Sequence, residues 1–376
     1  MIKKNRLKET ISLSVILFIN FIYLNKYAAR ITSHFLVIAL ISCSTLYIIW
    51  LKKTVIAKKM NFFDKKIYLI FYFFLALSLL YTIPKETIKV DRWSVITSFW
   101  DNFFQNQYVY YARSFDGNNP GPMPFYFIMS LPFYFLNELG LFSLVGACLL
   151  PLLFKKNNVD HHFSLYFVIC VFSPFYMHEV VCRSNIFSNA VIIVLVIFYF
   201  FKNYNGSVKS NIIFGIAIGC TLSTRNIFVI PYIILFIYAI KSKFINLKSA
   251  ISIALIAICI FAITFIPFAW NHISDFLKIN PFIIQSDYLL PLKYSLWFVF
   301  FSFAFGFFCK NKNDVYYYSG VLLFLTILFY HLLITSSDGF LKSFFDNGAD
   351  VTYFLFCIPF FMTYYLSTSK KIDHIK

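Results

Sequence analysis

The sequence predicts an all-α, polytopic membrane protein with about twelve transmembrane helices, organised as a single membrane domain over residues 1–376. Two observations support this fold class: 60% of the residues are apolar, and only 13% are charged. Soluble globular domains average about 25% charged residues, so a soluble fold is excluded. Apolar runs of about 17 to 25 residues can cross the hydrocarbon as helices, and shorter runs do so at a small mismatch cost.

The predicted spans follow one another along the whole chain. They cover residues 11–25, 31–51, 67–83, 139–154, 162–178, 185–201, 211–223, 226–240, 249–269, 293–309, 315–334 and 351–367. On the outer side the connections are unequal, and the three long ones are residues 84–138, 270–292 and 335–350. Loops held by a rigid scaffold commonly carry function, so the functional residues are expected in these three segments.

The net charge of +17 is interpreted as an orientation signal. With the N-terminus inside, the cytoplasmic segments hold 22 of the 33 Lys and Arg residues, and the outer segments hold the other 11. This division follows the positive-inside rule and places both termini in the cytoplasm of a multi-pass protein, with a bacterial plasma membrane as the expected location. The basic residues also attract anionic lipid heads of the bilayer, and no nucleic-acid partner is predicted.

The first long outer segment contains "KVDRWSVITSFWDNFFQNQYVYYARSFDGNNPGPMPFYF", residues 89–127. Its helical periodicity separates an apolar face from a polar one; the apolar face is Trp93, Ile96, Trp100, Phe103 and Phe104, and the polar face is Ser94, Ser98, Asp101, Asn102 and Gln105. This pattern predicts a helix lying in the membrane interface, with its apolar face in lipid. The apolar stretch 124–136 is only 13 residues long and contains Pro132, so it is predicted to be a second interfacial element.

This order of features resembles the GT-C superfamily of integral-membrane glycosyltransferases, which take a sugar from a polyprenyl phosphate. "DRWSVITSFWDNFFQNQYVY" and "GPMPFYFIMSLPFYFL" stand where that family has an acidic residue, interfacial helices and a proline-containing segment. Three later stretches are similar to further family segments: "RSNIFSNAVIIVLVIFYFF", "GIAIGCTLSTRNIFVIPYIILF" and "FIPFAWNHISDFLKINPF". The resemblance covers residues 85–300 and implies a GT-C-like fold.

The chain departs from the family pattern at three places. A pair of prolines is replaced by Pro122-Met123-Pro124, and Asn185 or Asn189 stands where many members carry an acid. The last outer segment reads "NGADVTYF", without the basic residue that members often have before a tyrosine. The second acid and the late phosphate contact of the family are therefore not matched.

The resemblance implies transfer of a hexosyl or pentosyl group from a polyprenyl-phosphate-linked donor to a glycan, lipid or protein acceptor of the cell envelope, with inversion by a carboxylate base. Such a base removes the proton of the attacking hydroxyl. Asp91 is the candidate, although an Asp directly before a helix is also a common N-cap. Asp101, Asp116 and Glu179 are secondary acid candidates, and Glu179 is expected instead to pair with Arg183 one helical turn along.

The leaving lipid phosphate requires fixed cations, and the planar guanidinium of Arg binds phosphate oxygens in pairs. Four arginines on the predicted outer side are the candidates for donor binding: Arg92, Arg113, Arg183 and Arg225. An Arg at a helix end can alternatively extend into the lipid headgroups. No metal site is predicted, because the sequence has no clear pair of closely spaced acids, and a divalent cation is left open only because some family members use one.

Two other function classes are weighed. An O-antigen or capsule-type polysaccharide polymerase would also have many spans and Arg-rich outer loops, but it would usually place its large loops later in the chain. A flippase for lipid-linked oligosaccharides would be expected to show two similar halves and charged residues inside the spans, and the sequence shows neither.

Overall fold

The computed structural model describes residues 2–27, 34, 44, 70, 73, 74, 77, 78, 80–87, 90–150, 173–345 and 349–368. These residues form helices, turns and loops, and no strand occurs among them. The all-α prediction is therefore confirmed for this part of the chain. Most of the predicted spans 31–51 and 162–178, and part of the span 67–83, lie outside the described residues.

Five helical segments of the described chain are long and apolar enough to cross a membrane: Arg6–Tyr27, Ile186–Asn203, Leu247–Lys278, Lys312–Asp338 and Val351–Thr368. The number rises to seven if each of two bent helix pairs counts as one span. The pairs are α6 (Pro124–Phe135) with α7 (Gly140–Leu149) and α17 (Pro281–Tyr288) with α18 (Leu292–Phe308). These helices support a membrane protein, and the count of twelve spans remains a prediction.

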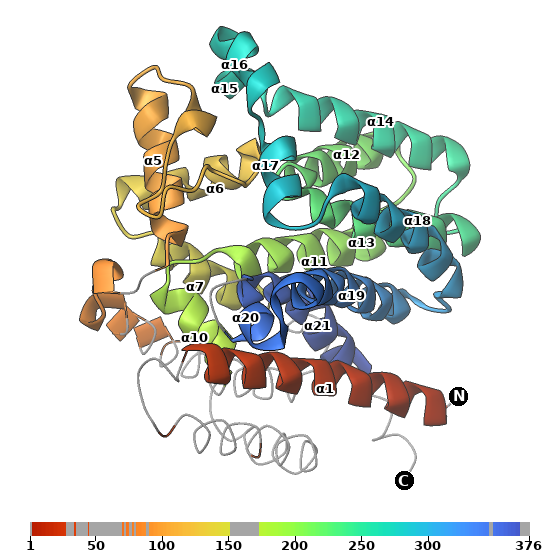
Figure 1. Cartoon of the computed structure of the whole chain (residues 1–376). Helices are drawn as coiled ribbons and strands as arrows, with labels where there is room; N and C mark the ends of the chain where they lie inside the picture. Colours follow the sequence, from red (N-terminus) through yellow and green to blue (C-terminus); the bar gives the residue numbers. More distant parts are fainter. Residues whose placement is uncertain are drawn as a thin grey trace.

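Helix α21 (Ile358–Thr368) lies beside three longer helices, which are α1 (Ile2–Tyr27), α11 (Ile186–Asn203) and α19 (Lys312–Asp338) (Figure 1). Helix α14 (Leu247–Ile263) lies farther up in the same view. The start of α1 is tied to the start of α19 by an ion pair of 2.5 Å between Lys8 Nζ and Asp314 Oδ1. Near the end of α1, Lys26 Nζ donates to the carbonyl oxygen of Ala349, which precedes η6 (Val351–Phe356) and α21. Helix α1 therefore runs parallel to α19 and antiparallel to α21.

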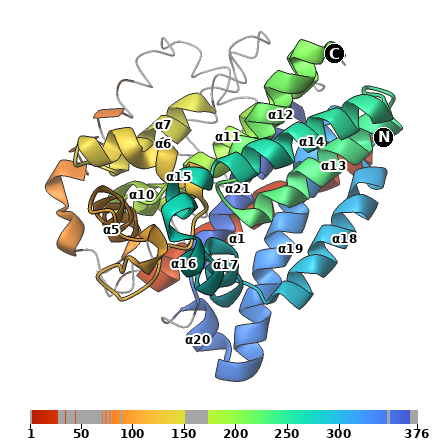
Figure 2. The same cartoon turned by 90° about the horizontal axis from the view of Figure 1, so that it is seen from above.

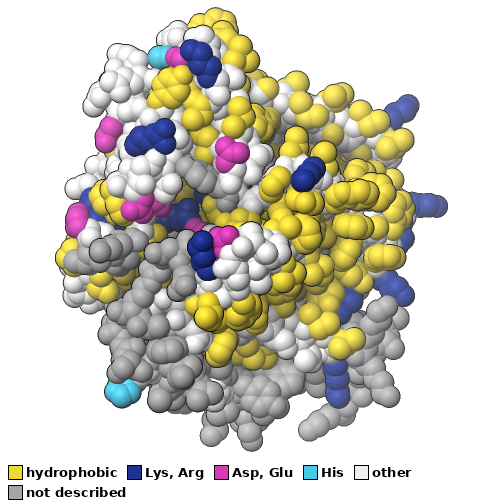
Figure 3. All heavy atoms as spheres, in the orientation of Figure 1, with side chains coloured by type: hydrophobic (Ala, Val, Ile, Leu, Met, Phe, Trp, Pro, Cys, Tyr) yellow, Lys and Arg dark blue, Asp and Glu magenta, His cyan; other side chains and the backbone are white. Residues whose placement is uncertain are grey.

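Where the structure describes them, segments predicted to lie on the same side of the membrane meet at the same end of the molecule. At the end that holds the start of α1, Lys312 Nζ donates to the Phe201 carbonyl at 3.2 Å. At the opposite end the three long outer segments touch, because Tyr111 donates to Asp275 at 3.0 Å and Arg92 pairs with Asp350. Figure 3 shows Lys and Arg side chains along the right edge, where α1 begins, and Asp and Glu side chains only in the left half. Which end faces the cytoplasm remains a prediction.

Two shorter apolar helices, α12 (Val208–Leu222) and α13 (Val229–Lys241), lie beside α14 and α18 (Figure 2). Helix α12 approaches α14 closely at Gly215 and Gly219. A Cβ atom at Gly219 would lie 2.5 Å from the carbonyl oxygen of Ala257 in α14. Small residues four positions apart let two helix backbones come together in a membrane, and these glycines act in that way.

Apart from the hydrophobic core among the long helices, a separate core forms where α5 (Arg92–Phe104) packs against α6. The rings of Phe99 and Phe127 stack at 3.6 Å, and Ile96 and Trp100 are 0% and 2% exposed. The prediction that this face of the helix lies in lipid is therefore wrong for Ile96 and Trp100. The reason is that α6 and the segment around Phe268 offer apolar surface that covers them, while Phe104 at the end of the helix stays half exposed.

The predicted second interfacial element is helix α6, which continues through Pro132. Pro124 stands in its first turn, where a missing N–H leaves no helical bond unmade. Helices α6 and α7 are bent by 118° relative to one another. This bend turns the chain from the end that holds α5 toward the bundle of long helices.

Candidate functional site

A cavity of about 270 Å³ lies where the first and third long outer segments meet the turn between α12 and α13, and it is called the arginine cavity here. It is lined by Asp91, Arg92, Val95, Asn118, Asn119, Gly121, Pro122, Tyr126, Arg225, Tyr330, Ala349, Asp350 and Tyr353. Arg92 belongs to the start of α5, Arg225 to the turn between α12 and α13, and Asp350 to the last segment before η6. Three of the sequence candidates, Asp91, Arg92 and Arg225, are therefore brought together.

Asp91 occupies the position directly before α5, but its side chain makes no capping hydrogen bond. Instead its Oδ2 atom accepts hydrogen bonds from Ser114 Oγ at 2.8 Å and from Asn118 Nδ2 at 2.7 Å. The alternative interpretation of Asp91 as a side-chain N-cap is therefore wrong. The carboxylate is held at the cavity wall by two donors from a distant part of the same loop.

These donors are positioned by a tight turn over residues 114–118. The Ser114 N–H donates to the Asn118 carbonyl at 2.9 Å, and Gly117 adopts a φ of +81°, a conformation that glycine reaches without steric cost. Arg113 is exposed and donates to the Gly117 carbonyl at 2.8 Å, so it stabilises the turn and does not line the cavity. Asp116 is also exposed, and its pKa is raised by partial burial and by the nearby Asp91 carboxylate.

Arg225 is 8% exposed and lies just before η4 (Asn226–Phe228). Its guanidinium stands 5.6 Å from the centre of the Tyr126 ring, and it interacts further with Tyr353. Among the residues that the structure describes, no carboxylate lies within ion-pair distance of Arg225, and its Nε atom has no hydrogen-bond partner. A buried charge without a counter-ion is costly, so this arginine is suited to an anion that enters the cavity.

Arg92 is oriented by the last outer segment. It pairs with the Asp350 carboxylate, donates from Nη2 to Thr352 Oγ1 at 3.0 Å, and lies 5.6 Å from the centre of the Tyr353 ring. The stretch "NGADVTYF" therefore supplies an acid and a tyrosine that contact cations from other segments. Sequence reasoning missed Asp350 and Tyr353, although an acid close before a tyrosine at the end of the third long outer segment was a signal for them.

The other candidates lie outside the arginine cavity. Glu179 is fully buried in α10 (Pro174–Val181), where it accepts a hydrogen bond from the Phe187 N–H at 2.9 Å, and desolvation raises its pKa to about 7. Arg183 contacts Glu138, with 3.4 Å between Nε and Oε1, so the predicted pairing of Glu179 with Arg183 is wrong. The chain turns at Arg183, whose φ is +54°, and its side chain donates to the carbonyls of Leu80 and Ile83.

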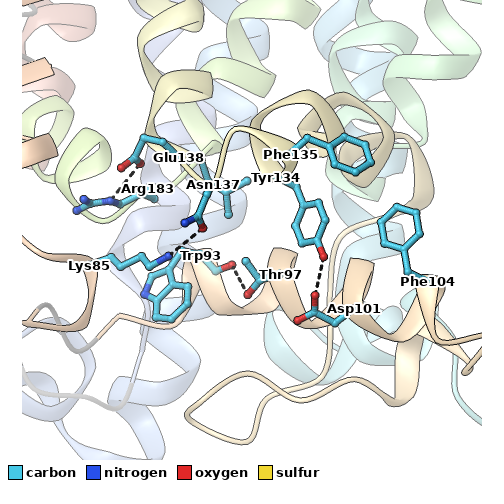
Figure 4. A pocket seen from close by; sticks show the side chains of 11 residues that line it. Lys85, Trp93, Thr97, Asp101, Phe104, Tyr134, Phe135, Asn137, Glu138 and Arg183 are labelled. Atoms are coloured by element: carbon cyan, nitrogen blue, oxygen red, sulfur yellow. Dashed lines mark hydrogen bonds and ion pairs between the residues drawn. The ribbon is translucent and has the colours of Figure 1, made fainter.

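Asp101 and Arg183 line a second, larger cavity on the other side of α5 (Figure 4). Asp101 Oδ1 accepts a hydrogen bond from the Tyr134 hydroxyl at 2.6 Å. The structure thus divides the predicted acids and arginines between two cavities, one exposed turn and one buried position.

Within the described ranges, no group of three or more His, Cys, Asp or Glu side chains is placed to hold a metal ion. Asp91 and Asp350 line the same cavity, and each is already bonded to other side chains. Whether the protein uses a divalent cation stays open, as in the sequence analysis.

Comparison of the chain with protein-family models, with curated proteins and with solved structures found no match. The GT-C resemblance therefore depends on the motifs quoted above alone.

Proposed function

We propose that this protein is a membrane glycosyltransferase of GT-C type that moves a sugar from a polyprenyl phosphate to a cell-envelope glycan, lipid or protein acceptor. The proposal includes the predicted fold of about twelve spans, with cytoplasmic termini and the arginine cavity on the outer face of a bacterial plasma membrane. The single observation that carries it is the buried Arg225, which has no carboxylate partner among the described residues, in one cavity with Arg92 and Asp91.

In the proposed reaction, an acceptor hydroxyl oxygen attacks the anomeric carbon of the donor sugar. The hydroxyl proton passes to the Asp91 carboxylate, and the bond between the anomeric carbon and the phosphate oxygen breaks with its electron pair on that oxygen. Attack opposite to the leaving group inverts the anomeric configuration. The polyprenyl phosphate leaves with added negative charge, which the guanidinium groups of Arg92 and Arg225 stabilise.

The cavity chemistry is consistent with these roles. Hydrogen bonds from Ser114 Oγ and Asn118 Nδ2 fix the orientation of the Asp91 carboxylate at the cavity wall. The Tyr126 ring lies against the Arg225 guanidinium, and an arginine held by a ring contact keeps N–H groups for a phosphate.

The test is a transfer assay with the purified full-length chain in lipid nanodiscs, a radiolabelled pool of polyprenyl-phosphate sugars and delipidated cell-envelope acceptors. Arg225→Gln is expected to lower transfer by at least about 10²-fold, as loss of one charge-stabilising group typically does. Lys278→Gln, which removes an exposed cation at the same end of the molecule, is the matched control and should transfer at the parent rate.

Other outcomes separate the alternatives. Lengthening of an existing repeat unit would favour the polymerase. Movement of lipid-linked sugar across the bilayer without a new glycosidic bond would favour the flippase. A parent protein that forms no glycosidic bond with any donor in the pool would refute the proposed function.

A further inference from the structure

Helix α5 separates two cavities. Side chains advance by about 100° per residue around an α-helix, so positions 91, 92 and 95 lie on the side of α5 opposite to positions 93, 97, 101 and 104. The first set lines the arginine cavity, and the second lines the larger cavity of about 540 Å³. Its volume falls within the range of about 300 to 1,000 Å³ that is usual for small-molecule sites. We call it the Trp93 cavity.

The walls of the Trp93 cavity combine aromatic rings with hydrogen-bonding groups (Figure 4). Trp93 lies on one side, with Lys85 Nζ 4.8 Å from the centre of its ring, and Tyr134 lies on the other side next to Phe104. Asp101 lies below the Tyr134 ring in this view and accepts a hydrogen bond from the Tyr134 hydroxyl. The indole Nε1 of Trp93 is buried and has no hydrogen-bond partner.

The charges in the Trp93 cavity do not favour a phosphate. Its two acids, Asp101 and Glu138, would repel an anion, and the Arg183 guanidinium is occupied by three backbone carbonyls and by Glu138. An acyl chain is not favoured either, because six of the eleven lining residues are polar or charged. A neutral, hydroxyl-rich ligand with apolar ring faces fits both properties.

We propose that the Trp93 cavity binds a saccharide chain. This chain is the acceptor whose hydroxyl reaches Asp91, and in that respect the proposal rests on the proposed function. The carboxylate of Asp101 and the amide of Asn137 accept and donate hydrogen bonds to sugar hydroxyls. The ring faces of Trp93 and Tyr134 carry negative π density that attracts the C–H faces of a pyranose.

The position of the cavity suits this role. Trp93 follows Asp91 by two residues, so one end of the Trp93 cavity lies beside the start of α5, where Asp91 stands at the wall of the arginine cavity. From Trp93 to Phe104 the cavity extends over eleven residues of helix, about 16 Å at 1.5 Å per residue. An acceptor chain lying along this length presents its terminal sugar to the start of the helix.

The test measures binding without turnover. The full chain in nanodiscs is applied to a printed panel of neutral, amino-sugar-containing and uronic-acid-containing oligosaccharides. Thr97→Trp fills the middle of the cavity, and Asp101→Asn removes a charged acceptor without adding bulk. Gln105→Trp introduces the same side chain at an exposed position directly after α5 and is the matched control.

The parent and Gln105→Trp are expected to bind the same oligosaccharides. Thr97→Trp should abolish that binding, and Asp101→Asn should weaken it at least about tenfold, as loss of a hydrogen bond to a charged group does. The proposal would be overturned if the parent and Thr97→Trp bound the oligosaccharides equally well, or if the parent bound none of them.

The transfer assay distinguishes this proposal from the proposed function. If sugar is transferred and the acceptor KM of Thr97→Trp equals that of the parent, the saccharide site is refuted and the transferase stands. If the panel result holds but no lipid-linked sugar is transferred, the saccharide site stands and the transferase is refuted.

Discussion

Replacing Asp91 with Asn is expected to lower the rate of sugar transfer by about 10² to 10⁴, the usual contribution of a general base. At about 1.36 kcal/mol for each factor of ten, this corresponds to about 2.7 to 5.4 kcal/mol of activation free energy. The substitution keeps an oxygen that can accept the bonds now made by Ser114 and Asn118 to Oδ2, at 2.8 and 2.7 Å. It removes the negative charge and basicity, so the turn over residues 114–118 should stay in place while proton removal fails.

The measurement is single-turnover transfer by parent and variant chains in nanodiscs at saturating donor and acceptor. Asp287→Asn, an exposed acid in α17, is the matched control for loss of one carboxylate at the same end of the molecule. Transfer by the Asp91→Asn protein at the parent rate would refute the reasoning. In that case the base would have to be sought among Asp101, Asp116, Glu179 and Asp350.

Three further results are expected. A cysteine placed at position 107 should react with an impermeant maleimide in intact cells, and a cysteine placed at position 209 should react only after permeabilisation, each compared with the labelling of the parent protein. The reverse pattern would show that the orientation is opposite to the predicted one. Glu179→Gln should raise the apparent Tm at pH 8 but hardly at pH 5. The pKa of the Glu179 carboxyl rises from 4.5 to about 7 on folding, so the folded state loses stability as the pH rises across that interval. Equal gains in Tm at both pH values would contradict this. Gly219→Ala should lower the apparent Tm, unlike Ile216→Val at an exposed site, because its Cβ would meet the Ala257 carbonyl at 2.5 Å; an unchanged Tm would show that the helices can separate freely.

The helices were predictable because hydrophobic periodicity and run length are local properties of the chain. The amphipathic pattern after Asp91 predicts a helix that the structure places at Arg92–Phe104, and the apolar run 249–269 corresponds to α14 at Leu247–Ile263. Lysine positions likewise predicted which helix ends lie together, and contacts such as Lys312 with Phe201 agree. Lipid exposure was less predictable, because the pattern cannot distinguish an apolar face covered by lipid from one covered by α6.

Half of the candidate site depended on contacts that no local pattern encodes. Arg92 and Thr352 are 260 positions apart in sequence, and only the fold brings them into contact. The pairing of Glu179 with Arg183 was expected from helical spacing, but α10 ends before Arg183, and the left-handed backbone there directs the side chain elsewhere. The departure at "NGADVTYF" had a physical meaning that the sequence alone did not reveal, because its acid meets an arginine from the first outer segment.

The pair of Arg92 with Asp350 allows the stabilising and the phosphate-binding roles of Arg92 to be separated. Arg92→Gln leaves the Asp350 carboxylate without its partner, so it should lower both the apparent Tm and the rate of transfer. Adding Asp350→Asn removes the unpaired charge, so the double variant should regain most of the lost Tm. It should not regain transfer, because the leaving phosphate still lacks one of its two cations. A double variant that recovers both Tm and transfer would show that Arg92 serves only to neutralise Asp350, and phosphate stabilisation would then fall to Arg225 alone.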